Sequence, residues 1–298
     1  MEKNIYLYEK VTVVIVTFKS EHIIEKCLDN IGQNHNIILV ENSNNIEFTN
    51  YLKKKYQNLE TINIGYDSGF GFAFNRGVEK VQTEYVVSIN PDSFPKKDCL
   101  AKLTQTADEN KNVACVVPAT YLDNGVEFWT YGNFDNKKKV VRNERNELTV
   151  DWVNGNVVLL KKDVFIKMGM FDENIFIEYD EIELQTRIFK ETDKKIIINF
   201  NAKSLHLEGK SANEKYAFEM KCEKYWHNAW SKYYYLKKHY GMICALKKIL
   251  PSFCINFIKM IIFYIINNKT KSKLYSLAVL GFIYSLFNKK SLYRADID

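Results

Sequence analysis

The chain has 298 residues, of which 46% are hydrophobic and 26% are charged, enough for one large core and an appendage. Its net charge of +6 is unevenly distributed. Residues 221–298 carry 14 Lys and Arg against 3 Asp and Glu, a net charge of +11, whereas the preceding 220 residues carry 28 against 33, a net charge of −5. This asymmetry predicts an acidic globular domain followed by a basic region whose partner is an anionic membrane surface, with no nucleic acid bound.

The six cysteines lie far apart in the sequence, without the Cys-x-x-Cys spacing of zinc sites. Cys27 falls in a helical pattern and Cys115 in an apolar run, so both are expected in the core. This spacing excludes a disulfide framework and favours a reducing compartment. The first four residues open no apolar segment, and we expect no signal peptide.

Apolar, β-branched runs alternate with helical patterns along the first 90 residues. Strands are expected at 11–17, 36–40, 61–64 and 86–89. Helices are expected at 20–31, capped by Ser20 and ended by Gly32, and at 48–56 and 72–81. This order predicts an α/β fold with a parallel sheet and right-handed crossovers.

The middle of the chain is less regular. A strand is expected at 113–118, followed by a polar stretch at 119–150 with a hairpin tip at Lys137–Lys139. The apolar run 153–160 is interrupted by Gly155. Helices are expected at 161–168 and 182–189, and a strand at 196–200 leads to His206.

From Tyr216 onward the pattern is helical and rich in aromatic residues interleaved with lysines. The two apolar segments 249–266 and 274–287 are expected to lie in or on a bilayer surface, and the second is shorter than the ~20 residues of a spanning helix. The alternatives are a buried helical hairpin or a two-helix span. The aromatic run 225–240 is equally suited to contact a second copy of the chain in a homo-oligomer.

Polar and glycine-containing loops follow the first four predicted strands. Since the carboxyl ends of parallel strands share one edge, these loops should line one groove suited to a nucleotide. Asp92, after Asn90 and Pro91, can hold a divalent cation there, or it can simply cap a turn. The residues expected to line this groove are Thr17, Phe18, Glu41, Asn63, Gly65, Gly71, Asn75 and Asn90.

Together these motifs resemble the family 2 glycosyltransferases, most closely the bacterial rhamnosyltransferase-like branch, over about residues 11–211. The resemblance implies a GT-A fold, a Rossmann-like and mostly parallel sheet flanked by helices, here followed by a C-terminal helical, membrane-associating extension. It implies a glycosyltransferase domain at 1–215, with a nucleotide-sugar half to about 118 and an acceptor half to 215, and a membrane-associated region at 216–298.

The resemblance assigns nucleoside contacts to Thr17, Glu41 and Asn63, although the family usually has Asp where this chain has Glu41. The Asp-x-Asp metal motif is represented by Asn90-Pro91-Asp92, which keeps only the second carboxylate. The implied cofactor is Mg²⁺ or Mn²⁺. Loss of the first carboxylate should weaken its binding, because cations prefer paired carboxylates.

In the acceptor half, Trp152 and Gly155 match the family's acceptor-side strand. Asp172 lies in a Gly-x-Phe-Asp-Glu turn, where we expect a structural role through turn hydrogen bonds. The family's general base follows. By position it is Glu181 and by residue type it is Asp180, and since ~100° of helix rotation separates them, only one can face the acceptor. We favour Glu181.

Four further residues complete the expected site and its surroundings. Glu183 and Arg187, four residues apart, are expected to form a helix-surface pair. His206 opens a match to the family's His-x-x-Gly-x-Ser motif. It is expected to complete the cation's shell or bind the diphosphate, with Lys210 holding phosphate. The other histidines are expected to be structural.

The implied reaction is inverting transfer of a sugar, rhamnose being a candidate, from a dTDP- or UDP-linked donor to an acceptor hydroxyl. The implied acceptor is a glycan or a polyprenyl-diphosphate-linked sugar, used by a cytoplasmic enzyme peripheral on the inner face of the cell membrane. The competing interpretations are a membrane-bound scaffold with a degenerate transferase domain and a sugar nucleotidyltransferase. The latter should have a glycine-rich loop after the first strand, where this chain has Thr17–Glu21.

Overall fold

The computed structural model describes residues 9–128, 130–135, 141–295 and 297. The chain divides into two compact units. The first, here called the sheet unit, runs to Ser68 and includes Phe72–Phe171 and Leu184–Asn213. The second, the helical unit, consists of Gly69–Gly71, Asp172–Glu183 and the chain from Glu214 onward. The boundary between the units at 213–214 lies close to the expected domain boundary at 215, but the helical unit also includes two earlier segments.

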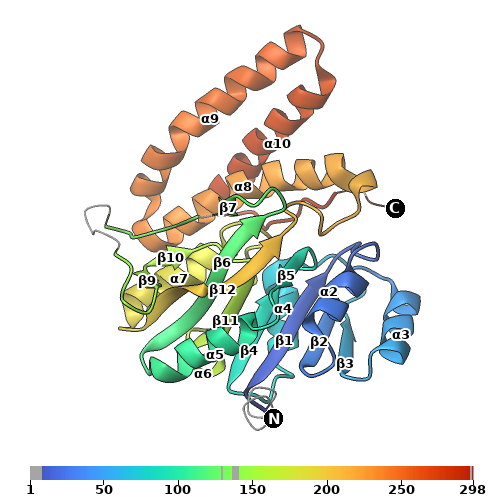
Figure 1. Cartoon of the computed structure of the whole chain (residues 1–298). Helices are drawn as coiled ribbons and strands as arrows, with labels where there is room; N and C mark the ends of the chain where they lie inside the picture. The colour runs from blue at the N-terminus through green and yellow to red at the C-terminus, as the bar shows by residue number, and fades with distance from the viewer. Residues whose placement is uncertain (1–8, 129, 136–140, 296, 298) are drawn as a thin grey trace. The chain divides into compact units, whose positions relative to one another are not determined.

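The first half of the sheet unit is parallel (Figure 1). Its strands lie in the order β3-β2-β1-β4. Their bounds are β1 Val11–Thr17, β2 Asn36–Glu41, β3 Leu59–Asn63 and β4 Tyr85–Ile89. The order reverses between β1 and β4, and in open α/β sheets ligands bind outside the strand ends at this switch point.

The second half of the sheet is mixed. The order continues β4-β11-β6-β12-β5, with β7 on β6 and β9 on β12. β12 runs parallel to β6, whereas β11 is antiparallel to both of its neighbours. The bounds are β5 Ser93–Pro95, β6 Val113–Leu122, β7 Glu127–Phe128, β9 Glu147–Val150, β11 Val157–Lys161 and β12 Lys195–His206; the separate pair is β8 Tyr131–Gly132 with β10 Trp152–Val153. The predicted mostly parallel sheet is confirmed, with antiparallel strands in its second half.

Helices cover both faces of this sheet. Alternate residues of β1, including Val13, join α2 (Ile24–Ile31), α3 (Ile46–Lys55) and α5 (Cys99–Glu109) in one core. The opposite face carries α4 (Phe70–Val78), which lies close to the sheet at Gly77. A Cβ on Gly77 would come within 2.6 Å of Val14 Cγ1 and 3.0 Å of Val40 Cγ2. Only a residue without a side chain permits this approach.

The remaining elements of the sheet unit correct several predicted boundaries. Ser20 does not cap α2, which begins at Ile24; the Ser20 hydroxyl instead bonds to the backbone of Phe18. The predicted strand at 196–200 lies in the first half of the longer β12. Helix α5 was missing from the sequence interpretation. Helices α6 (Lys162–Lys167) and α7 (Asp180–Glu191) match predicted helices, and the expected hairpin tip at Lys137–Lys139 lies outside the described residues.

The cysteine predictions are confirmed where the structure tests them. Cys27 and Cys115 are buried, and the six cysteines are all free thiols. Burial raises the pKa of the Cys27 thiol to about 12, with a smaller contribution from the charge of Asp92. These two side chains are therefore inert small core residues.

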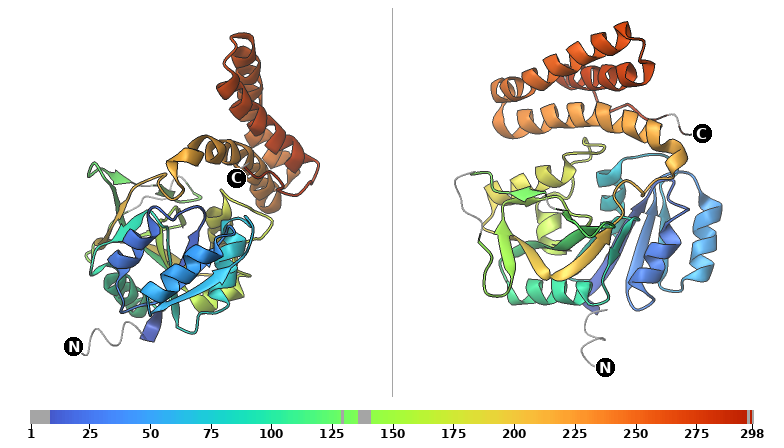
Figure 2. Two further views of the ribbon diagram at one scale, coloured as in Figure 1. Left: turned by 90° about the vertical axis from the view of Figure 1, so that its right-hand side faces the viewer. Right: turned by 45° about the horizontal axis from the view of Figure 1, so that its top comes forward.

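The helical unit contains three long helices, which lie side by side in Figure 2. They are α8 (Ala217–Tyr240), preceded by the short 3₁₀ turn Glu214–Tyr216, α9 (Met242–Ile265) and α10 (Lys269–Leu286). Helix α10 packs tightly on α8, because a Cβ on Gly281 would lie 2.1 Å from the Trp226 carbonyl oxygen. The inner face of α10, including Leu274 and Phe282, is buried, so this segment is in part the helical hairpin named above as an alternative.

Helix α9 differs from α10 in its exposure. It begins seven residues before the predicted apolar segment and continues through Pro251. Its length and composition suit a membrane-crossing helix, with a mean hydropathy of 1.6 over 18 residues. Only 6% of that window is buried within the chain, and Ile258, Ile262 and Ile265 are 56%, 48% and 74% exposed. Such a continuous apolar face is typical of a surface that contacts lipid or protein.

Candidate active site

The expected nucleoside contacts form a row at the carboxyl edge of the sheet unit. Thr17 is paired with Glu41 in the parallel register of β1 and β2, and Glu41 is paired with Asn63 in that of β2 and β3. All three therefore end their strands at one level. The structure brings these three predicted residues together.

The Glu41 carboxylate is 3% exposed and organises the turn after β2. Its oxygens accept from the Ser43 amide at 3.1 Å, from the Ser43 hydroxyl and from the Asn45 amide at 3.2 Å. Three donors make this an electrostatically stable site for a buried carboxylate. Glu41 thus fixes the shape of the loop that borders the predicted nucleoside site.

Asn42 is a site residue that the sequence interpretation did not single out. It is 2% exposed. Its amide oxygen accepts from the Ser68 amide at 3.1 Å and its amide nitrogen donates to Asp67 at 3.2 Å. It therefore ties the loop after β3 to the end of β2. The detectable signal was an Asn directly after a strand, where its side chain can bond to nearby backbone.

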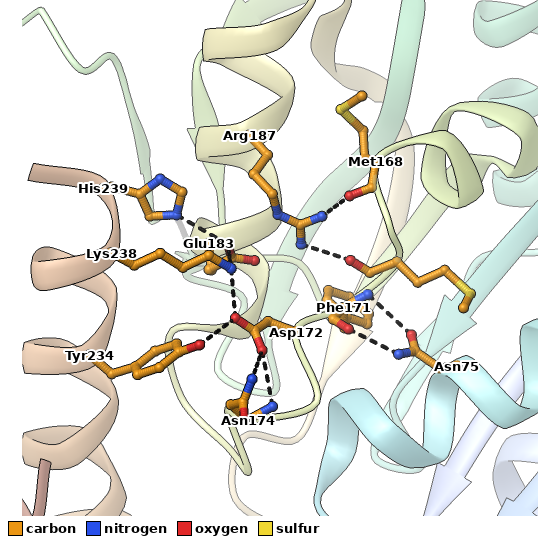
Figure 3. Close-up of polar contacts among 11 residues, drawn as sticks. Asn75, Met168, Phe171, Asp172, Asn174, Glu183, Arg187, Tyr234, Lys238 and His239 are labelled. Atoms are coloured by element: carbon orange, nitrogen blue, oxygen red, sulfur yellow. Dashed lines mark hydrogen bonds and ion pairs between the residues drawn. The ribbon is translucent and has the colours of Figure 1, made fainter. Parts of the chain in front are cut away.

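The remaining residues predicted to line the groove, from the end of β3 into α4, have structural contacts of their own. The Asn63 side-chain oxygen accepts from the Thr49 hydroxyl at 3.0 Å, and Gly65 has a φ of +85° that favours glycine. The Asn75 amide is buried and exchanges hydrogen bonds with the Phe171 backbone at 3.0 and 3.1 Å, as Figure 3 shows. Gly71 belongs to the helical unit.

Asp92 lies beyond β4, next to the switch point between β1 and β4. It is 1% exposed. Its Oδ1 is 3.4 Å from His206 Nε2, and its Oδ2 accepts from the Lys210 amide at 3.1 Å. Burial raises the pKa of Asp92, but His206, the Ser211 hydroxyl and the Lys210 amide together hold it below its ordinary value. Asp92 is therefore an ionised interior carboxylate at neutral pH.

The end of β12 and the segment after it are held in place by contacts with Asp92, Ser93 and His22. His206 pairs with Ser93 in the β12–β5 register, and the Leu207 amide donates to the Asp92 carbonyl at 3.0 Å. Further along, the Lys210 carbonyl lies 2.9 Å from His22 Nε2. The predicted proximity of His206, Lys210 and Asp92 is thus present in the structure.

The side chains at Asp92 could ligate a divalent cation whose coordination shell is completed by a bound substrate. A buried carboxylate oxygen and an imidazole nitrogen lie 3.4 Å apart. Among the described residues there is no group of three or more His, Cys, Asp and Glu side chains of the kind that holds a metal alone. Mg²⁺ and Mn²⁺ often take one or two carboxylates and fill the remaining positions with substrate phosphates and water. The site therefore suits a cation held jointly with a diphosphate.

Four predicted residues border the same sheet. The Asn90 amide donates to the Asn156 carbonyl at 2.9 Å, and the Phe18 amide donates to the Ser20 hydroxyl at 3.3 Å. Trp152 packs over Gly132, where a Cβ would lie 2.9 Å from its ring. A Cβ on Gly155 would lie 2.5 Å from Val158 Cγ2, so packing already requires this glycine.

The two candidate bases, Asp180 and Glu181, occupy the first turn of α7. The chain enters this turn through Glu178 and Tyr179, whose φ values of 63° and 70° lie in the left-handed region that non-glycine residues rarely adopt. Asp180 is 9% exposed, whereas Glu181 is partly exposed. Burial, together with the charges of Glu178 and Glu183, raises the pKa of Asp180 to about 6.

Glu183, one turn further on, is fully buried in the helical unit (Figure 3). Its Oε1 lies 2.7 Å from Lys238 Nζ and 3.1 Å from His239 Nε2 on α8. The predicted surface position of Glu183 is wrong, because the side chain is fully buried and binds α8, whereas its pairing with Arg187 stays a prediction. The Arg187 guanidinium donates to the Met168 carbonyl and, at 2.7 Å, to that of Met170.

Asp172 bears out the expected turn contacts and adds two contacts with α8. Its Oδ1 accepts from the Asn174 amide at 3.0 Å, while Oδ2 accepts from the Tyr234 hydroxyl at 2.9 Å and Lys238 Nζ at 2.6 Å. Burial raises the pKa of Asp172, but Lys238 and Asn174 lower it below its ordinary value. Lys238 therefore joins two carboxylates, and the link from α8 to the turn before α7 could not be read from local sequence.

Comparisons with known proteins agree with this architecture. A low-salt glycan biosynthesis hexosyltransferase of Haloferax volcanii is 22% identical over 62% of this chain and 63% of its own length. An N-acetylglucosaminyl-diphospho-decaprenol L-rhamnosyltransferase of Mycobacterium tuberculosis is 20% identical over 60% and 70%. A rhamnosyltransferase of Escherichia coli is 24% identical over 60% and 76%. The chain thus spans under two thirds of the length of the first of these relatives.

Solved structures show the same fold at low sequence identity. A mannosyltransferase of Pyrobaculum calidifontis, solved with GDP-Man and Mn²⁺, has a TM-score of 0.55 at 12% identity, over 94% of this chain and 88% of its own. Staphylococcus aureus TarS with UDP-GlcNAc has a TM-score of 0.53 at 13% identity, over 97% and 94%. The predicted GT-A fold is confirmed. The family model for glycosyl transferase family 2 matches residues 12–166, more than half of the sequence, so the chain belongs to that family, in its rhamnosyltransferase-like branch.

Proposed function

We propose that this protein is an inverting glycosyltransferase that moves a sugar from a nucleotide-diphosphate donor to an acceptor hydroxyl during synthesis of a surface polysaccharide. The observation that carries the proposal is the row Thr17–Glu41–Asn63 at the carboxyl edge of the sheet, with Asp92 at the adjoining switch point. A nucleoside and a diphosphate need adjacent sites of this kind. The family assignment supports the reaction class.

Asp92 and His206 would hold a divalent cation on the donor's diphosphate, and Lys210, whose backbone amide bonds to Asp92, would contribute positive charge. Bound there, Mg²⁺ or Mn²⁺ neutralises part of the negative charge that the leaving diphosphate develops. The Mn²⁺ present in the P. calidifontis mannosyltransferase structure supports this choice. The chain's own part is to keep Asp92 ionised and fixed through the Lys210 amide.

For the acceptor we propose Asp180 as general base. A base works best when its pKa is close to the operating pH, and the pKa of Asp180 is raised to about 6. It remains mostly ionised at pH 7 and can take the proton of the attacking hydroxyl. Sequence position favours Glu181, but Glu181 lacks this degree of burial.

The donor and acceptor classes are proposed from the relatives. The M. tuberculosis and E. coli relatives are rhamnosyltransferases, and the first acts on a diphospho-decaprenol acceptor, so dTDP- or UDP-linked sugars and a polyprenyl-diphosphate acceptor are the first to test. The exposed face of α9 supports attachment to the membrane surface, which would bring the enzyme to such a lipid.

Donor binding is tested by the shift in thermal unfolding midpoint with nucleotide-sugars, with and without Mn²⁺. A ligand at one hundred times its Kd stabilises the folded state by about 2.7 kcal/mol. We expect a metal-dependent shift for one donor, lost in Asp92→Ala and kept in Asp163→Asn. Asp163 lies in the first turn of α6, shortly after Lys161, which pairs with Tyr85 at the opposite end of β4. No shift with any donor, or an equal shift in Asp92→Ala, would refute the site.

A further inference from the structure

A pocket lies between the three long helices of the helical unit and has no assigned role. It has a volume of about 420 Å³. Polar residues of α8 and α9 line it together with aromatic residues of α8, α9 and α10. The residues that carry the argument are Lys224, Asn228 and Lys232 of α8, Ser252, Asn256 and Lys259 of α9, and Tyr275 of α10.

The pocket is lined by three lysines together with apolar and aromatic side chains. Of the described residues that line it, none is acidic. Lys224 pairs with Glu178 at 3.5 Å, and Asn228 donates to the same carboxylate at 3.3 Å, so the charge at that end is partly compensated. Lys259 Nζ lies 5.3 Å from the centre of the Tyr275 ring. A ligand here would meet ammonium and amide donors beside aromatic walls.

The orientation of α9 is the second observation. Ser252, Asn256 and Lys259 line the pocket, while Ile258, Ile262 and Ile265, on average about a third of a helical turn away, are 56%, 48% and 74% exposed. Helix α9 therefore presents polar side chains to the pocket, and next to them it carries an aliphatic stripe that is exposed to solvent. In membrane helices polar side chains face a protein interior or cavity in the same way.

We infer that this pocket binds the phosphate-bearing head of a single membrane lipid, whose chain continues along the apolar face of α9. The lysines and amides match phosphate oxygens, and the aromatic walls match the first carbons of the chain. The head can come from an anionic phospholipid of the bilayer or from an isoprenoid diphosphate. The inference rests on the proposed membrane attachment of these helices and is independent of the residues proposed for catalysis.

The test is a titration of the full-length chain with farnesyl diphosphate in detergent, followed by tryptophan fluorescence or calorimetry. Asn256→Trp fills the pocket without changing the net charge, and Lys232→Gln/Lys259→Gln removes two of its cations. The matched control is Lys247→Gln/Lys269→Gln, which removes two exposed lysines that do not line the pocket. Circular dichroism and the unfolding midpoint check that each variant folds.

We expect saturable binding of one molecule per chain, weakened about tenfold or more in both pocket variants and unchanged in the control. Competition by phosphatidylcholine vesicles containing phosphatidylglycerol would identify phospholipid as a source. Absence of competition would identify the isoprenoid diphosphate. Equal binding by Asn256→Trp, equal loss in the control, or equally tight binding of inorganic pyrophosphate would overturn the inference. If lipid binding fails while a nucleotide-sugar still shifts the thermal unfolding midpoint in a metal-dependent way, the pocket inference is wrong and the proposed transferase function is unaffected.

Discussion

At the scale of single residues, the environment of each carboxylate assigns its role better than the motif does. Asp172 and Glu183 are both bound by Lys238, which stabilises their charged forms. Asp180, three residues before Glu183, lies next to acidic neighbours, and its pKa moves in the opposite direction from that of Asp172. When neighbouring carboxylates have pKa values shifted in opposite directions, the one with the raised pKa is the candidate for proton transfer, here Asp180.

This assignment predicts the pH dependence of the reaction. Because the base must be ionised, kcat/KM should fall as pH drops through about 6, the pKa of Asp180. Asp180→Asn should lose about 10²–10⁴-fold in rate, and Glu181→Gln much less. The measurement is the pH profile of sugar transfer by the wild type and both variants. A profile flat down to pH 5, or a larger loss in Glu181→Gln, would move the role to Glu181.

The same shift has a consequence for stability. A carboxyl whose folded pKa lies above its unfolded value of 3.8 favours the folded state when protonated, and that contribution is lost as pH rises from about 4 to about 6. At neutral pH the ionised Asp180 thus costs stability, about 2–3 kcal/mol for a shift of this size. Asp180→Asn should therefore raise the urea midpoint at pH 7 and change it little at pH 4. An equal decrease at both values would contradict this.

Glu183 gives the opposite expectation. Glu183→Gln leaves Lys238 with Asp172 alone and His239 without its carboxylate, so it should destabilise the fold by about 2–4 kcal/mol. Urea unfolding at pH 7 measures this, with the exposed Glu144→Gln as control. If both variants unfold at the same urea concentration, the Glu183 contacts contribute nothing to stability.

At the scale of elements, α9 and α10 have similar composition but different surroundings. Helix α10 buries its inner face on α8, whereas α9 leaves its aliphatic stripe exposed. Each half-exposed isoleucine that enters an interface contributes about 1 kcal/mol. Ile258→Ser/Ile262→Ser should therefore weaken binding to anionic liposomes by roughly thirtyfold in a sedimentation assay. The control is Ile46→Ser/Ile166→Ser, with 54% and 49% exposure on α3 and α6. Equal binding of both double variants would exclude α9 as the attachment surface.

The contact of α10 with α8 depends on one glycine. On an exposed helix Gly→Ala adds about 1 kcal/mol of stability. At Gly281 the new Cβ would lie 2.1 Å from the Trp226 carbonyl oxygen, so the helices must move apart. We expect Gly281→Ala to destabilise the helical unit by about 1–3 kcal/mol in thermal unfolding. A raised midpoint would mean that the helices do not pack this closely.

These elements also show what local sequence can and cannot predict. Strand β1 matched residue for residue, because a buried parallel strand is a continuous β-branched run. The row Thr17–Glu41–Asn63 followed, since parallel strands share an edge. Helix α5 and the antiparallel β11 were missed because they are defined by long-range packing. The burial of Glu183 depends on α8, more than 50 residues away, so helical spacing alone could not show that this side chain is covered.

At the scale of the whole molecule, the chain combines two units. The edge of the sheet unit is proposed to bind the nucleotide-sugar donor, and the exposed face of α9 in the helical unit is proposed to contact lipid. The candidate base lies on a segment, Asp172–Glu183, that belongs to the helical unit although sequence order places it inside the transferase domain. The helical unit therefore carries both the proposed acceptor chemistry and the proposed membrane contact. This arrangement suits an acceptor that is itself a lipid.

The most direct measurement is sugar transfer to a polyprenyl-diphosphate acceptor by four proteins, the wild type, Asp92→Asn, Asp180→Asn and Asp163→Asn, each checked for folding. The account predicts transfer with inversion at the anomeric carbon by the wild type and Asp163→Asn. It predicts a loss of at least about a hundredfold in Asp92→Asn and in Asp180→Asn. Full transfer by either of these two variants would contradict the assignment of donor and acceptor chemistry to Asp92 and Asp180.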